Sequence, residues 1–457
     1  MQSISDDDLY RRLCFDNPWW AVSAETEVRF RHPPRRAFFP AFFERVTEAP
    51  GDRPLLLAGP LRAGKTVMLR QAVARLIEQG VPPTSVLYCS LATPSTAGAP
   101  LQRLVEVFRT RHGHGPEDRV YLFLDELPYA HNWAQGIDDL AWAHPGTRVV
   151  GALSAAAPAL VTGDSGTGKG PQVFVLPPLT FSEFLRFRGT EETLFGPAAD
   201  VGVGSTVVRP AVVRTLNDEF HRYVNFAGFL EGVLGKARGS PAPAFIRGGL
   251  AERVLHRDLA SLAGINDSGE LNRLFAILAL NTAREVTMEE LAKEAGIAKN
   301  TLRKYLDYLE SAFLVRRLPR VDRRARRFQR AVAFKVHLTA PCLYAALFGP
   351  VGPGDEAFPW LAETALVAQW LGSPAMADLA YASWRGGTVD LLALDPETGH
   401  PDHAYEIDWA DATPGAEKGP RRLARFVEGT NRAARAYVLT RSVARPASVG
   451  GLEITLA

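Results

Sequence analysis

The sequence is poor in cysteine, carries almost no net charge and contains no long apolar run. Its three cysteines, Cys14, Cys89 and Cys342, are too few and too far apart for a disulfide framework or a zinc site. No stretch of about 18 uncharged apolar residues occurs, so no transmembrane helix and no membrane partner are expected. The formal net charge is +2, which excludes a basic field over the whole surface and leaves nucleic-acid binding to local clusters of charge.

What the chain does contain is the ordinary composition of a globular protein. Of its 457 residues, 46% are apolar and 22% are charged, and the length suggests about three domains. The start, MQSISDDDLYRR, is acidic and lacks the apolar core of a secretory signal. Together with the scarce cysteines, this favours a cytoplasmic location.

One glycine-rich segment has every part of a phosphate-binding loop. Residues 59–66, GPLRAGKT, match G-x-x-x-x-G-K-[ST] in full. The apolar run 53–58 predicts a buried strand before the loop, and the spacing of apolar residues over 67–79 predicts a helix after it. Backbone N–H groups then converge on the phosphates of a nucleotide. The residues expected to contact ATP are Gly59, Pro60, Leu61, Arg62, Ala63, Gly64, Lys65, Thr66 and Val67.

A second glycine-rich segment, GDSGTGK at residues 163–169, lacks that context. Gly170 stands where Ser or Thr should ligate magnesium, and Pro171 follows it. The next run, VFVLPPL, predicts a strand, so no helix opens at this loop. We expect a surface loop, with a secondary anion contact as the alternative.

The other half of an ATP site is expected at the ends of two later strands. In the loop itself, Lys65 is expected on the β- and γ-phosphates and the Thr66 hydroxyl on Mg²⁺. Residues 120–126, VYLFLDE, predict a strand that delivers Asp125 to Mg²⁺ and Glu126 to the attacking water. Ser154 follows a strand at 148–153, where it either senses the γ-phosphate or belongs to an ordinary turn.

Four segments occur in an order that resembles a known family: GPLRAGKT, LDELPYAHNW, LPPLTFSEFLRF and YVNFAGFLEGV. Over roughly residues 40–441 the chain is similar to predicted prokaryotic AAA+-type P-loop ATPases with an uncharacterised C-terminal region. Leu61 departs from the family's usual arginine, and GALSAAA replaces its TGSS-like strand. The resemblance implies an α/β fold with a P-loop NTPase parallel sheet, and a C-terminal α/β domain like restriction endonucleases, the PD-(D/E)xK type.

A helix-turn-helix pattern lies between these regions. Thr287 and Glu290 form a capping-box match at the start of one helix, and Gly296 ends it. The next helix begins with candidate nucleic-acid contacts. These are Lys299, Asn300, Arg303 and Lys304.

An arginine-rich run follows directly. Residues 316–330 hold eight arginines and one acid, Asp322. We expect the β-wing of a winged helix here, with Arg323, Arg324, Arg326 and Arg327 near DNA phosphates. The alternatives are a solvated loop or a winged helix that docks on protein.

The C-terminal region carries the carboxylates that the family resemblance implies, but not the lysine. Asp390 and Glu406 lie on predicted strands and Glu363 on the preceding helix. Asp408 occupies the position where a nuclease of this type has its lysine. We therefore expect a degenerate nuclease site that retains the fold without the cutting activity.

The expected domains are an N-terminal segment (1–40), an ATPase core (41–190), a helical lid (191–268), a winged helix (269–345) and a PD-(D/E)xK-like domain (346–457). The expected function is Mg²⁺-dependent ATP hydrolysis coupled to movement of a winged helix that contacts DNA or a protein partner. A homo-oligomer, in which Arg253 or Arg257 serves as an arginine finger, is a further possibility that the sequence leaves open. Two alternatives are a nucleic-acid-binding regulator with slow ATP turnover and a metal-dependent nuclease.

Overall fold

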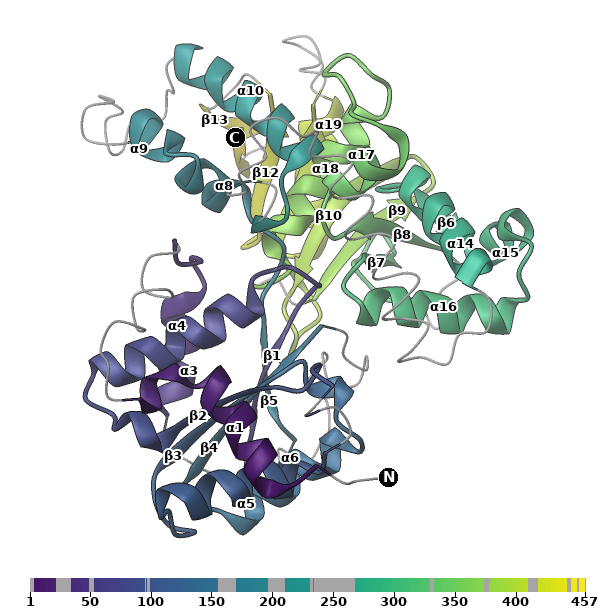
Figure 1. Cartoon of the computed structure of the whole chain (residues 1–457). Helices are drawn as coiled ribbons and strands as arrows, with labels where there is room; N and C mark the ends of the chain where they lie inside the picture. The colour runs from purple at the N-terminus through teal and green to yellow at the C-terminus, as the bar shows by residue number, and fades with distance from the viewer. Residues whose placement is uncertain are drawn as a thin grey trace. The chain divides into compact units, whose positions relative to one another are not determined.

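The computed structural model in Figure 1 forms two compact units, Met1–Leu176 and Pro177–Ala457. It describes residues 4–21, 34–48, 53–94, 96, 99–154, 170–195, 210–230, 233, 268–328, 333–373, 378–409, 418–441, 445–449 and 452–456. The candidate arginine fingers, Arg253 and Arg257, and the second glycine-rich loop at 163–169 lie outside these residues. No helix in the described ranges is long and apolar enough to cross a bilayer.

The first unit is a parallel sheet of five strands in the order β2-β3-β4-β1-β5. All four pairings between neighbouring strands are parallel. Its elements are α1 (Asp6–Asp16), η1 (Pro18–Trp20), α3 (Phe39–Thr47), β1 (Leu55–Ala58), α4 (Lys65–Glu78), η3 (Pro83–Ser85), β2 (Val86–Ser90), α5 (Leu101–His112), β3 (Val120–Asp125), η4 (Leu127–Tyr129), α6 (Trp133–Ala143), β4 (Thr147–Leu153) and β5 (Gln172–Val175).

The predicted strands and helices of this unit are present, with ends that shift by a few residues. The run expected as a strand at 53–58 is shorter, β1, and the helix after the loop begins at Lys65 rather than Val67. The segment after the second glycine-rich loop is a strand, β5, as expected.

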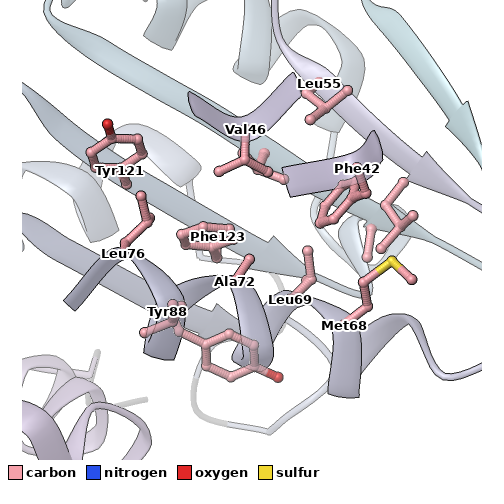
Figure 2. Close-up of a cluster of buried hydrophobic side chains, with 14 of the residues drawn as sticks. Phe42, Val46, Leu55, Met68, Leu69, Ala72, Leu76, Tyr88, Tyr121 and Phe123 are labelled. Carbon is pink, nitrogen blue, oxygen red and sulfur yellow. The ribbon is translucent and has the colours of Figure 1, made fainter. Parts of the chain in front are cut away.

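Helices α3 and α4 cover one face of this sheet. Figure 2 shows Phe42 and Val46 of α3 and Leu69 of α4 packed among side chains from the strands, such as Phe123. The four side chains are fully buried. Burial of one large apolar side chain contributes about 1.5–3 kcal/mol, so this layer fixes α4 on the sheet and with it the loop that precedes α4.

The N-terminal segment closes the open edge of the sheet at β2. Asn17 donates from Nδ2 to the Tyr88 carbonyl oxygen (2.7 Å) and accepts from the Tyr88 backbone N–H (2.6 Å). The indoles of Trp19 and Trp20 both donate to the Val86 carbonyl oxygen. Side chains thus satisfy backbone groups that an edge strand otherwise leaves unpaired.

The second unit is built on a mixed sheet of nine strands in the order β13-β14-β12-β11-β10-β9-β7-β8-β6. Its elements are α8 (Phe181–Phe187), α9 (Thr190–Phe195), α10 (Pro210–Phe226), α14 (Ser268–Leu280), β6 (Glu285–Thr287), α15 (Met288–Ala295), α16 (Lys299–Ser311), β7 (Val315–Val321), β8 (Ala333–Leu338), α17 (Cys342–Phe348), α18 (Phe358–Trp370), β9 (Leu379–Trp384), β10 (Gly387–Leu394), β11 (Pro401–Asp408), α19 (Lys418–Thr430), β12 (Arg435–Thr440), β13 (Arg445–Val449) and β14 (Leu452–Leu456).

Two segments expected as separate domains share this sheet. Residues 269–345 contribute the order helix, strand, two helices and two strands, and Figure 1 shows α14, α15 and α16 grouped beside β6, β7 and β8. The later segment contributes β9 to β14. The two join where β7 pairs with β9 in parallel, Arg320 opposite Tyr381 and Val321 opposite Ala382.

The helix boundaries around α15 follow the predicted capping chemistry. The Thr287 hydroxyl accepts from the Glu290 backbone N–H, and the Glu290 carboxylate accepts from the Thr287 backbone N–H. Gly296 ends the helix with a left-handed φ of 68°. Side chains that are adjacent in sequence determine these ends, so the sequence alone predicts them.

Gly146, in the turn before β4, offers a test of the backbone packing in the first unit. A Cβ added there would lie 2.3 Å from the Glu117 carbonyl oxygen. We expect Gly146→Ala to lower the free energy of unfolding by about 1–3 kcal/mol, because the backbone must shift. Urea unfolding followed by circular dichroism measures this change.

The matched control is Gly115→Ala, whose added Cβ meets nothing closer than the Asp118 carboxylate at 3.7 Å. We expect a change within about 0.5 kcal/mol. Equal stability of the two variants would contradict the close backbone approach at Gly146.

Candidate active site

The loop between β1 and α4 has the backbone that its sequence requires. Gly64 takes a φ of 97° at the start of α4, in the left-handed region that favours glycine. Gly59 has no room for a side chain, because an added Cβ would lie 2.2 Å from the Leu176 carbonyl oxygen. Arg62 also has a left-handed φ, 64°. The predicted loop therefore turns tightly against the end of β5.

Lys65 is buried at the base of this loop. Only 4% of the residue is exposed, and its Nζ donates to the carbonyl oxygens of Gly59 (3.0 Å) and Pro60 (2.8 Å). The ammonium group thus lies inside the turn that is expected to hold phosphate. A phosphate oxygen would be a charged acceptor in place of a neutral carbonyl, and charge-assisted bonds are roughly twice as strong.

Arg36 supports the loop from the N-terminal side and was missed by the sequence analysis. Its Nη1 donates to the Ala63 carbonyl oxygen at 2.7 Å, and the residue is 3% exposed. The guanidinium also lies over the Phe38 ring at 5.6 Å. Its signal in the sequence was weak, since two arginines before an aromatic helix are common on surfaces.

Asp125 ends β3 beside the loop and accepts hydrogen bonds from three directions. The Thr66 hydroxyl and the Tyr88 hydroxyl both donate to its Oδ2 at 2.7 Å, and the Glu126 backbone N–H donates to Oδ1 at 3.1 Å. The carboxylate is 2% exposed. The structure therefore brings together the two residues predicted to hold Mg²⁺, Thr66 and Asp125.

Tyr88 is a second residue that the sequence analysis did not single out. Burial and the adjacent Asp125 carboxylate raise the pKa of the Tyr88 hydroxyl, so it stays protonated and remains a donor. The Arg70 guanidinium lies over its ring at 4.4 Å. No local pattern around Tyr88 points to this role, because the partner of its hydroxyl lies 37 positions away.

Glu126 and Ser154 meet at the ends of β3 and β4. The Ser154 hydroxyl lies 3.1 Å and 3.0 Å from the two carboxylate oxygens of Glu126 and donates its one proton to that group. Glu126 has a left-handed φ of 56° at the point where β3 ends. Such a conformation in a non-glycine residue is uncommon, and it turns the side chain of Glu126 out of the strand's alternation. The contact ties the Ser154 hydroxyl to Glu126, and both roles named for Ser154 stay predictions.

Hydroxyl and carboxylate oxygens are the ligands that Mg²⁺ prefers, so the pair Thr66 and Asp125 fits this ion. No group of three or more His, Cys, Asp or Glu side chains in the described part of the chain is arranged to hold a metal. A Mg²⁺ ion here would therefore take most of its remaining ligands from water and from phosphate, which is how Mg²⁺ binds at nucleotides.

The expected nucleic-acid residues on α16 are exposed together. Lys299, Asn300, Arg303 and Lys304 lie at positions one turn apart on the first half of the helix, and Lys299 is 3.6 Å from the exposed Glu289. The opposite side of α16 is buried through Leu302, Leu306 and Leu309, among others. The helix thus presents one polar face that is basic.

Six of the eight arginines of 316–330 divide into two groups. Arg317 pairs with Asp307 at 2.7 Å and with Glu310 of α16, Arg320 lies 3.7 Å from Glu285, and Arg327 pairs with Asp378. These acids neutralise part of the positive charge of the run, so that part needs no external anionic partner. The second group is exposed, and its side chains make no ion pair with described residues: Arg323, Arg324 and Arg326.

The C-terminal carboxylates meet a lysine that comes from another part of the chain. Lys335 on β8 donates to Glu363 on α18 at 2.7 Å and lies 3.6 Å from Asp390 on β10. Burial alone would lower the pKa of Lys335, but the two carboxylates raise it and keep the ammonium charged. The signal in the sequence was a lysine in the short strand AFKVHL, which is apolar apart from Lys335 and His337.

Glu406 and Asp408 on β11 do not join this ion pair directly. Glu406 pairs with Arg422 of α19, and its Oε2 is buried without a hydrogen-bond partner in the described residues. Asp408 is partly exposed at the end of the strand. His337 lies beside the cluster, and burial lowers its pKa well below the ordinary value.

Glu406 makes folding stability depend on pH. Burial, opposed by Arg422 and aided by Asp390 and Asp408, raises the pKa of Glu406 from 4.5 to about 7. The folded state then holds this proton more tightly than the unfolded state does. Stability should therefore fall by on the order of 2–3 kcal/mol as pH rises from about 4.5 to about 7, and level off above.

Urea unfolding of the wild type and of Glu406→Gln between pH 5 and 8 measures this contribution. We expect Glu406→Gln to flatten the decline, and the exposed control Glu397→Gln to leave it as in the wild type. An unchanged slope in Glu406→Gln would show that the carboxylate titrates normally.

Comparisons with known proteins bear on two stretches of the chain. Residues 51–185 match a family model described as an AAA domain, and residues 217–351 match one described as a domain of unknown function, DUF8612. An uncharacterized protein of Haemophilus influenzae is 22% identical over 279 residues, which cover 59% of this chain and 63% of that protein. The chain thus spans less than two thirds of that relative's length.

Two solved structures align with this chain at low TM-scores. AMPPCP-bound DnaA from Aquifex aeolicus aligns with a TM-score of 0.27 and 13% identity over 60% of this chain and 85% of that one. C. elegans PCH-2 aligns with a TM-score of 0.26 and 12% identity over 68% and 72%. At these scores neither structure carries an argument about activity. The family match and the loop geometry agree that residues 51–185 form a P-loop domain similar to AAA domains.

Proposed function

We propose that the protein binds and hydrolyses ATP with Mg²⁺ at the loop of residues 59–66, and that this cycle moves a winged-helix module that contacts DNA. The observation that carries the first part is the hydrogen bond between Thr66 and Asp125, because it joins the phosphate loop to the acid at the end of β3. When bound, Mg²⁺ would be held by these two residues and would neutralise charge on the phosphates.

Lys65 and Glu126 have separate tasks in this proposal. Lys65 exchanges its bonds to the Gly59 and Pro60 carbonyls for phosphate oxygens, which gives a charged acceptor to a buried ammonium group. Glu126 accepts a hydrogen bond from the attacking water and orients it. Ser154 positions Glu126, since its hydroxyl is already bonded to that carboxylate.

Residues 269–345 are proposed as the moving winged helix. Their order of elements, α14-β6-α15-α16-β7-β8, with β8 paired antiparallel to both β6 and β7, supports this assignment. The basic face of α16 and the exposed group Arg323, Arg324 and Arg326 support DNA as the partner. A protein partner is the alternative, because much of the remaining arginine charge is neutralised within the chain.

The C-terminal cluster is proposed to be structural; the sequence predicted a degenerate nuclease site here. The Lys335 ammonium already lies between Glu363 and Asp390, where it compensates two carboxylates. Removal of one partner from a buried ion pair typically costs 3–5 kcal/mol, because it leaves the other charge buried and uncompensated.

Lys65→Ala tests the proposed ATPase. We expect phosphate release from ATP to fall by about 100-fold or more, because a donor aimed at the transferred phosphoryl group is lost. Arg75→Ala removes an exposed cation from the same helix and should leave turnover unchanged. Unaltered turnover in folded Lys65→Ala protein would refute the assignment. Stimulation of the wild type by duplex DNA would favour the coupled switch over a regulator with slow turnover.

The exposed arginine group can be tested through its salt dependence. Replacing Arg323, Arg324 and Arg326 by alanine should weaken duplex DNA binding and reduce the slope of log affinity against log salt by up to about three. The control replaces Arg385, Arg425 and Arg432, which are also exposed and carry the same charge. Fluorescence anisotropy at several salt concentrations measures both. Identical slopes would favour a protein partner.

A further inference from the structure

The second unit contains a pocket that the ATPase proposal does not use. It has a volume of about 440 Å³ and lies between α10, the start of α18 and the residues that follow β11 and β12. Its chemistry is carried by Arg214, His221, Arg222, Phe358, Trp409 and Arg441, and we call it the arginine pocket.

The chain builds the arginine pocket from one helix face and two strand ends. On α10, Arg214 precedes His221 by seven residues and Arg222 by eight. This spacing is about two helical turns, so the three side chains lie on the same face. Strands β11 and β12 are parallel, with Asp408 opposite Thr440, so the residues that follow them emerge at one edge of the sheet. Ligands of α/β sheets commonly bind at such carboxyl ends.

Two hydrogen bonds fix this arrangement before any ligand arrives. Asn217 of α10 donates from Nδ2 to the Arg441 carbonyl oxygen at 2.9 Å, which joins the helix to the strand end. His221 donates from Nε2 to the Val351 carbonyl oxygen at 2.8 Å, so its ring is held in place. The pocket walls are therefore preformed, which lowers the cost of ordering them on binding.

The charge of the arginine pocket favours an anion. Three arginines line it, against one acid, Asp218. Arg222 is already paired with Glu219 at 2.7 Å. Arg214 is exposed and has no hydrogen-bond or ion-pair partner among the described residues. Guanidinium groups converging on one cavity are suited to phosphate, which they bind through paired hydrogen bonds.

The opposite wall is aromatic and holds an unsatisfied donor. The Trp409 ring lies 5.0 Å from Phe220 and 5.4 Å from Phe358, centroid to centroid. Its indole Nε1 is buried and has no hydrogen-bond acceptor in the described part of the chain. The part of the indole that lines the pocket therefore offers an aromatic surface.

We propose that the arginine pocket binds a nucleotide unit, separate from the ATP in the P-loop domain. The arginines hold the phosphate, and the planar base lies against the partly exposed Trp409 ring. A free nucleotide and a nucleotide within a single strand share this chemistry. The proposal does not depend on ATP hydrolysis in the first unit.

Calorimetric titration of the full chain carrying Lys65→Ala tests the pocket with the first site disabled. The probes are ADP, a 5′-phosphorylated thymidine tetranucleotide and inorganic pyrophosphate. We expect ADP or the oligonucleotide to bind once per chain, and the one that binds identifies the source. Binding of neither, or pyrophosphate binding as tightly as the nucleotide, would overturn the proposal.

Two sets of variants in the same background assign the binding to the arginine pocket. Arg214→Ala with Arg441→Ala should weaken nucleotide binding by about 10- to 100-fold, as expected for two lost phosphate contacts. The charge-matched control, Arg385→Ala with Arg432→Ala, should leave it unchanged. Trp409→Phe should abolish the ligand-induced change in tryptophan fluorescence. Equal affinity in the first pair and its control would exclude the pocket.

Discussion

A buried carboxylate has to be satisfied by hydrogen bonds, and Asp125 imposes this requirement on the whole first unit. Its donors come from the phosphate loop, from β2 and from the backbone of the next residue. The two side-chain donors are held by further contacts: Thr66 by the burial of α4 against the sheet, and Tyr88 by the amide of Asn17. The geometry of the nucleotide site is therefore maintained from the N-terminal segment as well as from the loop.

The parts of this site that the sequence revealed are those whose chemistry is local. The loop, its flanking strand and helix, and the acids at 125 and 126 follow from the spacing of neighbouring residues. Arg36, Tyr88 and Lys335 could not be found in this way, because their partners lie 27, 37 and 28 positions away along the chain. The hydrogen-bond partner of a buried polar residue can be identified only once the fold shows which distant residue lies beside it.

The same distinction between local and distant contacts explains which features of the second unit could be predicted from the sequence. Strands were predicted around Asp390 and Glu406, where β10 and β11 lie, and capping residues predicted the ends of α15. Neither signal tells which strands are neighbours. The pairing of Arg320 with Tyr381 across β7 and β9 joins two segments that looked like separate domains, and no local pattern encodes it.

That shared sheet has a mechanical consequence. An isolated helical module at the end of a linker could swing by bending a few loop residues. Here the strand β7 is hydrogen-bonded on one side to β8 and on the other to β9. After β7, the Arg327 guanidinium forms an ion pair with Asp378, which precedes β9. A push delivered to any one strand would be carried by backbone hydrogen bonds into its neighbours. The basic helix α16 and the arginine pocket would therefore move together as parts of one rigid unit. A ligand bound at either place would change the free energy of the same motion.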